Sequence, residues 1–118
     1  MSKEVDRLHL AEMLEAADRI SWDIAGFDLE MFERVSTTRD AVSMNLVVIG
    51  EGAARLTDAL KAHAPDVPWG ELIGLRNRLA HGYSRTDPKV IFEAVTLHLP
   101  DLVIELRRLS DLLSPSLD

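Results

Sequence analysis

The sequence contains no cysteine, and its 118 residues include only one tyrosine, two tryptophans and three phenylalanines. Without cysteine, a disulfide framework and a thiolate metal site are both excluded. No apolar run approaches the roughly 18 residues that a membrane-spanning helix needs. The charged first residues are not followed by the apolar segment of a secretory signal. We therefore expect one cytoplasmic domain over residues 1–118, with its core at about 4–113, since one domain usually holds about 100–150 residues.

Acidic side chains outnumber basic ones, and the net charge is −7. This charge argues against a protein that coats nucleic acid. The basic residues are concentrated, however, because residues 71–90 hold three arginines and one lysine against two acids, a local charge of +2. The rest of the chain therefore carries −9. An acidic body with one basic stretch fits a small anion site better than a long groove that follows phosphates.

Apolar residues recur at three- and four-residue steps along most of the chain, which is the period of amphipathic helices. No β-alternation of useful length is present. The stripes predict helices over about residues 4–25, 28–35, 36–62, 66–82 and 87–113. Ser36, Thr37 and Thr38 offer N-cap oxygens to the third helix, and Pro100 predicts a kink in the last one. The expected fold class is all-α, a four- to five-helix up-down bundle with a kinked last helix.

Gly50 and Gly52 flank Glu51 inside an apolar helix, where each glycine costs about 1 kcal/mol relative to alanine. Such a pair indicates close contact with a neighbouring helix. Glu51 is interpreted as the buried partner of an arginine, with a catalytic role as the alternative. We expect His9, His63 and His98 to be structural, because no pair of histidines has the spacing of metal ligands. No metal or cofactor site is predicted.

One segment near a helix end carries most of the candidate chemistry. It contains Arg76, Asn77, Arg78, His81 and Tyr83. His81 is the best acid or base candidate, because the negative end of the helix dipole favours its charged form, and the Arg76 guanidinium suits a phosphate. Each residue turns about 100° around a helix, so Arg76 and His81 lie about 140° apart. Either the helix loosens at its end or the two residues flank a groove. The alternative is an ordinary helix end with solvated arginines.

The spacing of Arg76, His81 and Tyr83 resembles the R-x4-H-x-Y signature of the HepT-like branch of the HEPN superfamily. Further family motifs follow the same order along the chain. They resemble N-L-x-x-I-G-E at 45–51, the I-P-W lead-in at 68–69 and P-x-L at 100–102. The resemblance covers about residues 5–112. The sequence departs from the family pattern at Gly52, Ser84, Arg85 and Phe92, outside the arginine and histidine of the signature.

The resemblance implies an all-helical homodimer that acts as a toxin with endoribonuclease activity. It also implies an MntA-like minimal nucleotidyltransferase as antitoxin, as in type VII-like HepT/MntA toxin–antitoxin pairs. Tyr83 would accept AMP from that partner, and this AMPylation would silence the toxin. Arg76 and His81 would then be the catalytic residues, with Asn77 and Arg78 in support.

Cleavage of RNA without a metal needs a base for the 2′-hydroxyl and an acid for the departing 5′-oxygen, and histidine can serve as either. The motif supplies one histidine per chain. A two-fold dimer would bring two copies of His81 into one groove, where Arg76 from each chain would stabilise the phosphorane charge. The alternatives are a non-catalytic helical partner of a nucleotidyltransferase and a structural dimer without a ligand.

Overall fold

The computed structural model describes residues 2–114, apart from the side chain of Tyr83, and every regular element in this part of the chain is helical. The expected all-α class is therefore confirmed. The elements are α1 (Ser2–Asp23), α2 (Leu29–Arg34), α3 (Ser36–Arg55), α4 (Asp58–Lys61), α5 (Trp69–Gly82), the 3-10 turn η1 (Tyr83–Arg85), α6 (Pro88–Glu93), the π-helical segment η2 (Ala94–His98) and α7 (Leu99–Leu113). Within residues 2–114, no helix has the length and apolar character to cross a membrane.

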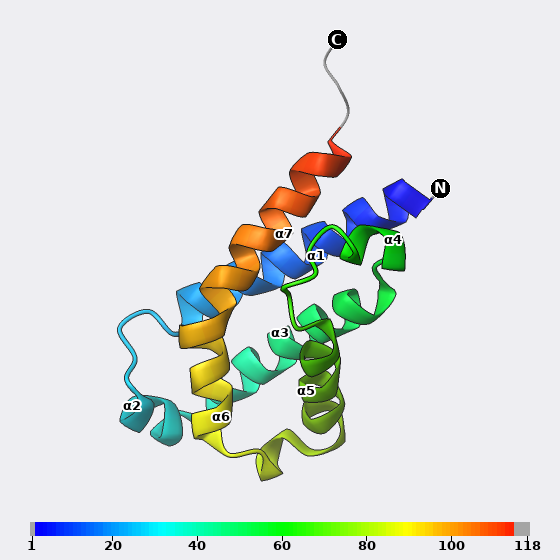
Figure 1. The fold of residues 1–118 in the computed structure, drawn as a ribbon. Coiled ribbons are helices and arrows are strands. Elements are labelled where there is room, and N and C mark those ends of the chain that lie inside the picture. Colours follow the sequence, from blue (N-terminus) through cyan, green and yellow to red (C-terminus); the bar gives the residue numbers. More distant parts are fainter. Residues whose placement is uncertain (1, 115–118) are drawn as a thin grey trace.

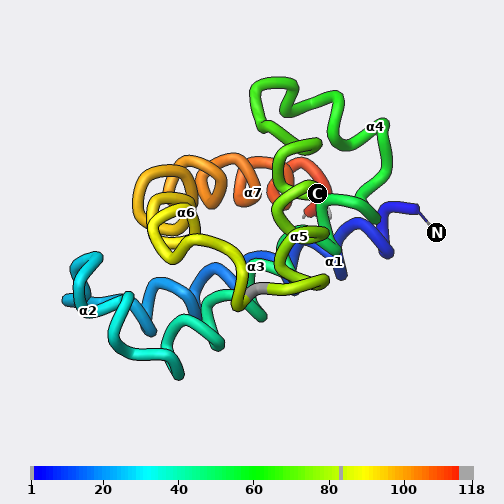
Figure 2. The backbone as a smooth tube through the Cα atoms, turned by 90° about the horizontal axis from the view of Figure 1, so that it is seen from below, coloured from blue at the N-terminus to red at the C-terminus, as the bar shows by residue number. Residues whose placement is uncertain are grey.

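The helices form two layers, seen edge-on in Figure 2. One layer holds α1 and α3, which pack along each other, and the other holds α5 and the bent arm of α6, η2 and α7 (Figure 1). Helix α5 packs on α3, whereas α7 packs on α1. Helix α5 and the arm thus rest on different helices of the layer formed by α1 and α3.

The predicted apolar stripes form the core between these layers. Met13 and Ile20 of α1 and Val42 and Ile49 of α3 are almost completely buried. The buried leucines of α7 also belong to this core. They are Leu99, Leu102, Leu106 and Leu109.

The third predicted helix is interrupted, which the sequence pattern did not show. We expected it to run from 36 to 62, but α3 ends at Arg55 and α4 starts at Asp58. The buried carboxylate of Asp6 accepts hydrogen bonds from the backbone nitrogen and the hydroxyl of Thr57, at 3.0 and 2.7 Å. The Thr57 hydroxyl also caps α4 by accepting from the backbone nitrogen of Leu60. A residue of α1 thus fixes the break.

The N-cap predicted for α3 and the start predicted for α5 are wrong. Ser36 already lies inside α3, whose N-cap is Val35 without a side-chain hydrogen bond. Helix α5 begins at Trp69, three residues after the predicted start at about 66. By contrast, the helix predicted from about 87 starts as expected, where Asp87 caps α6 by accepting from the backbone nitrogen of Lys89.

The predicted kink at Pro100 takes the form of the π-helical segment η2. The backbone nitrogen of Leu99 donates to the carbonyl of Ala94, a five-residue step. Proline at 100 cannot donate a hydrogen bond and crowds the preceding turn, which explains why the helix widens there. The arm bends between α6 and α7 in Figure 1.

Candidate active site at the end of helix α5

Helix α5 remains α-helical through Gly82, so one of the two geometries left open by the sequence is excluded. The helix does not loosen between Arg76 and His81, and these residues therefore lie about 140° apart around its axis. Arg76 faces α3 and is half-buried, whereas His81 is exposed. A single chain does not bring the two side chains of the motif onto one face.

The guanidinium of Arg76 forms an ion pair with Glu51 of α3. Nη1 of Arg76 donates to Oε1 of Glu51 at 2.8 Å, and the two side chains are 23% and 38% exposed. Nη2 of Arg55 lies 3.6 Å from the second carboxylate oxygen of Glu51. The predicted pairing of Glu51 with an arginine is therefore confirmed, although the carboxylate is only partly buried. Two arginines around one carboxylate leave this cluster a formal charge of +1.

The glycines beside Glu51 allow the helices to approach closely, as their sequence context predicted. A methyl group at Gly50 would lie 2.3 Å from Cβ of Arg76 and 3.0 Å from the carbonyl oxygen of Leu72. A methyl group at Gly52 would meet Cγ and Sδ of Met13 at 2.3 and 2.4 Å. Gly50 thus sets how near Arg76 stands to α3, whereas Gly52 sets the contact with α1.

We expect opposite effects from two glycine-to-alanine substitutions in this region. Gly50→Ala should lower the free energy of unfolding by about 1–3 kcal/mol, because the methyl group would push α5 away from α3. Gly74→Ala should raise it by up to about 1 kcal/mol, since alanine favours a helix interior and a methyl group there meets no atom within 4 Å. Urea unfolding followed by circular dichroism measures both values. Equal effects would contradict the close contact at Gly50.

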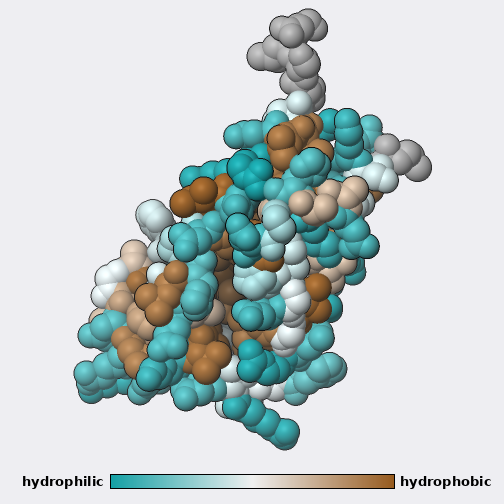
Figure 3. Space-filling view, viewed as in Figure 1, coloured by the Kyte–Doolittle hydropathy of each residue, from teal (hydrophilic) through white to brown (hydrophobic). Residues whose placement is uncertain are grey.

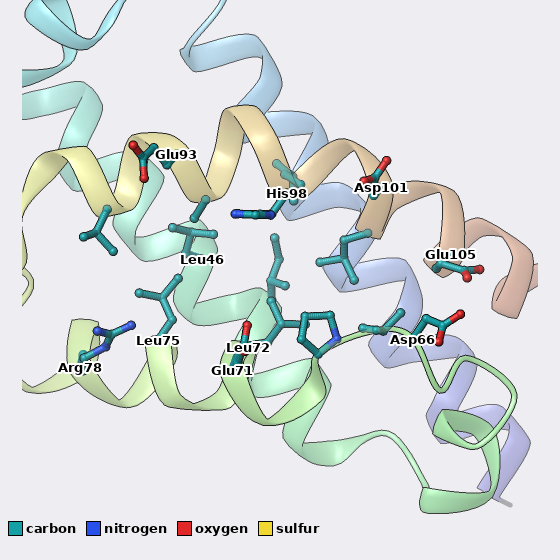
Figure 4. A pocket seen from close by; sticks show the side chains of 17 residues that line it. Leu46, Asp66, Glu71, Leu72, Leu75, Arg78, Glu93, His98, Asp101 and Glu105 are labelled. Carbon is teal, nitrogen blue, oxygen red and sulfur yellow. The ribbon is translucent and has the colours of Figure 1, made fainter.

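The supporting residues lie on different sides of α5. Asn77 is exposed and precedes His81 by four residues, so the two side chains share the outer face of the helix. Arg78 turns the other way, toward the space between α5 and the α6–α7 arm (Figure 4). The motif therefore separates into an outer face with Asn77 and His81, an inner face with Arg76, and Arg78 on a third side.

The 3-10 turn begins at Tyr83, directly after α5. The predicted modification site falls on the side chain of this residue, which lies outside the described part of the structure. The other histidines are dispersed: His9 is on α1, His63 follows α4 and His98 ends η2. Among residues 2–114, no three acidic or histidine side chains come together in a way that could hold a metal ion.

The all-helical fold, with the Arg76–Tyr83 motif at the end of α5, is the architecture that the resemblance to the HEPN superfamily implied. A family model described as ribonuclease HepT-like matches residues 13–109. The chain therefore belongs to the HepT-like family. A Methanocaldococcus jannaschii protein named "Putative RNase" is 30% identical over 102 residues, which make up 86% of this chain and 94% of the relative.

A second relative is named probable ribonuclease HepT and comes from Thermococcus cleftensis. It is 29% identical over 93 residues, which are 79% of this chain and 82% of the relative. No solved structure gives a significant match. The relatives are thus matched over most of their length as well as over most of this chain.

Proposed function

We propose that this chain is a toxin-type, metal-independent endoribonuclease whose active site is completed by a second copy of the chain. Membership of the HepT-like family and the ribonuclease names of its relatives support the reaction class. The observation that carries the dimeric site is the separation of Arg76 from His81 around a regular helix. A second copy would supply the residue that each face lacks.

The geometry of α3 and α5 supports the assignment of separate roles to the two motif residues. Glu51 holds Arg76 through Nη1, so the guanidinium is fixed in orientation, and its second terminal nitrogen, Nη2, can still donate to a phosphate. His81 is exposed and, among the described residues, has no side-chain hydrogen bond. It is therefore free to exchange protons with a substrate. Asn77 on the same face would orient the histidine or the RNA backbone.

In the proposed dimer, one copy of His81 removes the proton from the 2′-hydroxyl of the RNA. The 2′-oxygen then bonds to the adjacent phosphorus as the bond to the 5′-oxygen breaks. The second copy of His81 gives a proton to that leaving oxygen. The Arg76 guanidinium groups stabilise the negative charge of the phosphorane. The products are a cyclic phosphate and a 5′-hydroxyl.

Mixing active and inactive chains tests this shared site. Parent chain and His81→Ala chain are combined in equal amounts and allowed to exchange subunits. RNA cleavage should fall to about one quarter of the parent rate, because only dimers with two intact histidines would cleave. Each preparation must come from cells that lack a partner nucleotidyltransferase. A fall to about one half would indicate an independent site in each chain and contradict the proposal.

We further propose that the chain belongs to a type VII-like HepT/MntA toxin–antitoxin pair and that AMPylation of Tyr83 silences it. Tyr83 starts the turn two residues after His81. An attached AMP would add a phosphodiester with about one negative charge at a groove intended for an RNA phosphate, so it would repel and block the substrate. The regulator would be an MntA-like minimal nucleotidyltransferase.

Mass spectrometry can test this modification directly. Co-expression with such a nucleotidyltransferase should add AMP to a peptide containing Tyr83 and abolish RNA cleavage. Tyr83→Phe should receive no AMP at this position and should stay active under the same conditions. Full silencing of Tyr83→Phe would show that the partner inhibits by another route.

A non-catalytic binding partner of a nucleotidyltransferase is the second candidate function. The ion pair between Arg76 and Glu51 favours it, because the pair reduces the positive charge available to RNA, and the net charge of −7 slows encounter with nucleic acid. An RNA assay on the unmodified chain separates the two candidates. Cleavage supports the enzyme, whereas tight binding of the transferase by a chain that leaves RNA intact supports the binding partner.

A further inference from the structure

A groove of about 570 Å³ lies between α5 and the α6–α7 arm, on a different side of α5 from Arg76 and His81. Figure 3 shows a hollow with an apolar floor between hydrophilic walls, and Figure 4 shows it from close by. Its volume lies within the range of about 300–1,000 Å³ that is typical of ligand sites. The floor is formed by side chains from three helices, which include Leu46, Ile49, Leu72, Leu75, Leu99 and Leu102.

The groove exists because α5 and the α6–α7 arm pack on different helices of the other layer. Helix α5 packs on α3, and α7 packs on α1, so the space between α5 and the arm is left open. The π-helical segment forms part of one wall through Ala94 and His98. Such segments interrupt an α-helix at a cost and occur frequently at functional sites. Val90, which also lines the groove, is 40% exposed although it is apolar.

The rim of the groove is strongly acidic. With five acids against Arg78, and His98 neutral, the formal charge of the lining is −4. Glu93 and Glu105 have basic neighbours in Lys89 and Arg108, but the described residues offer no ion pair to the others. The five acids are Asp66, Glu71, Glu93, Asp101 and Glu105, and they lie on both walls in Figure 4.

The charge of the rim decides between possible occupants. RNA is disfavoured, since its phosphates would face the acidic rim. A second copy seated on this groove is disfavoured as well, because a two-fold contact through the groove would bring identical acidic rims together. A partner with apolar side chains flanked by cations matches both the floor and the rim. An amphipathic helix presents these groups at the required steps of three and four residues.

We propose that this groove docks a basic amphipathic helix of a partner protein, with its apolar face on the leucine floor and its lysines or arginines against the acidic rim. This inference does not depend on the proposed ribonuclease activity. The acidic rim lies on one side of α5, and Arg76 with Glu51 and Arg55 lies on another side. One helix therefore separates a surface suited to a basic protein segment from a surface suited to an anion.

Peptide binding to the full chain tests the proposal. The probe is a fluorescent peptide of about 15 residues, or about four helical turns, with leucines on one face and lysines on the other. The matched probe replaces each lysine by glutamate. Glu71→Lys/Asp101→Lys reverses two rim charges. The control variant, Glu12→Lys/Asp18→Lys, makes the same change in net charge at exposed positions of α1, outside the groove.

Fluorescence anisotropy should detect binding of the lysine peptide to the parent chain and not of the glutamate peptide. The rim variant should weaken this binding at least tenfold, whereas the control variant should change it by less than about twofold. Equal binding of both peptides or equal weakening in both variants would overturn the proposal. So would a change in the oligomeric state of the peptide-free rim variant, which would identify the groove as a self-interface.

Discussion

Replacement of His81 by alanine should lower the rate of RNA cleavage by about 100- to 10,000-fold, the usual contribution of general acid–base catalysis. The proposed reaction moves two protons, and His81 is the one histidine of the motif in each chain. The substitution removes the acid and the base together in a homodimer. Its exposed position on α5 predicts little effect on folding, so thermal unfolding of the variant should match that of the parent.

His63→Ala is the matched control for this experiment. His63 is also exposed, and its hydrogen bonds are made by its backbone: the nitrogen donates to the carbonyl of Leu60 at 3.0 Å, and the carbonyl accepts from Arg108 at 2.6 Å. The His63→Ala chain should cleave RNA at the parent rate. The assay is run with and without EDTA, and the parent rate should be the same in both. If His81→Ala retained the parent rate, or if EDTA abolished cleavage, the proposed chemistry would be wrong.

Arg76→Ala should reduce RNA cleavage by about 100-fold or more, because a fixed donor to the developing phosphorane charge is lost. In contrast to His81→Ala, this change should also destabilise the fold. Removal of Arg76 leaves the partly buried Glu51 without its closest cation. Since both side chains of the pair are partly exposed, the expected loss in the free energy of unfolding is only about 1 kcal/mol.

Two further variants separate the catalytic effect of Arg76 from its effect on folding. Arg76→Lys can keep the ion pair with Glu51 but lacks the planar fork of donors, so it should restore stability while cleavage remains at least about tenfold reduced. Arg107→Ala removes an exposed arginine of α7 and should change neither property. Recovery of full cleavage in Arg76→Lys would indicate that Arg76 acts only through its charge or its contact with α3.

The local sequence pattern was sufficient to predict most of the helices, because their apolar faces follow the helical period. Position 57 shows where local pattern fails. The residues around Thr57 look helical, yet the chain breaks there because Asp6, which is 51 positions away, accepts two hydrogen bonds from Thr57. No property of the segment itself reveals this partner.

Only part of the candidate site could be predicted from the sequence. The two glycines beside Glu51 indicated a close helix contact and an arginine partner, and Arg76 fills that role. Arg55 as a second cation near Glu51 was missed, although its i+4 spacing offered a signal. The acidic groove was also missed, because its walls come from helices that are distant in sequence and rest on different neighbours.

The separation of Arg76 from His81 by about 140° around α5 has a consequence for how activity depends on the expression level. If neither face of α5 can cleave RNA alone, a newly made chain is inactive until it binds a second chain. At concentrations below the dimer dissociation constant, the amount of dimer rises with the square of the chain concentration. Low background expression would then give far less RNA cleavage than proportionality predicts, whereas a twofold rise in expression would give about four times as much dimer.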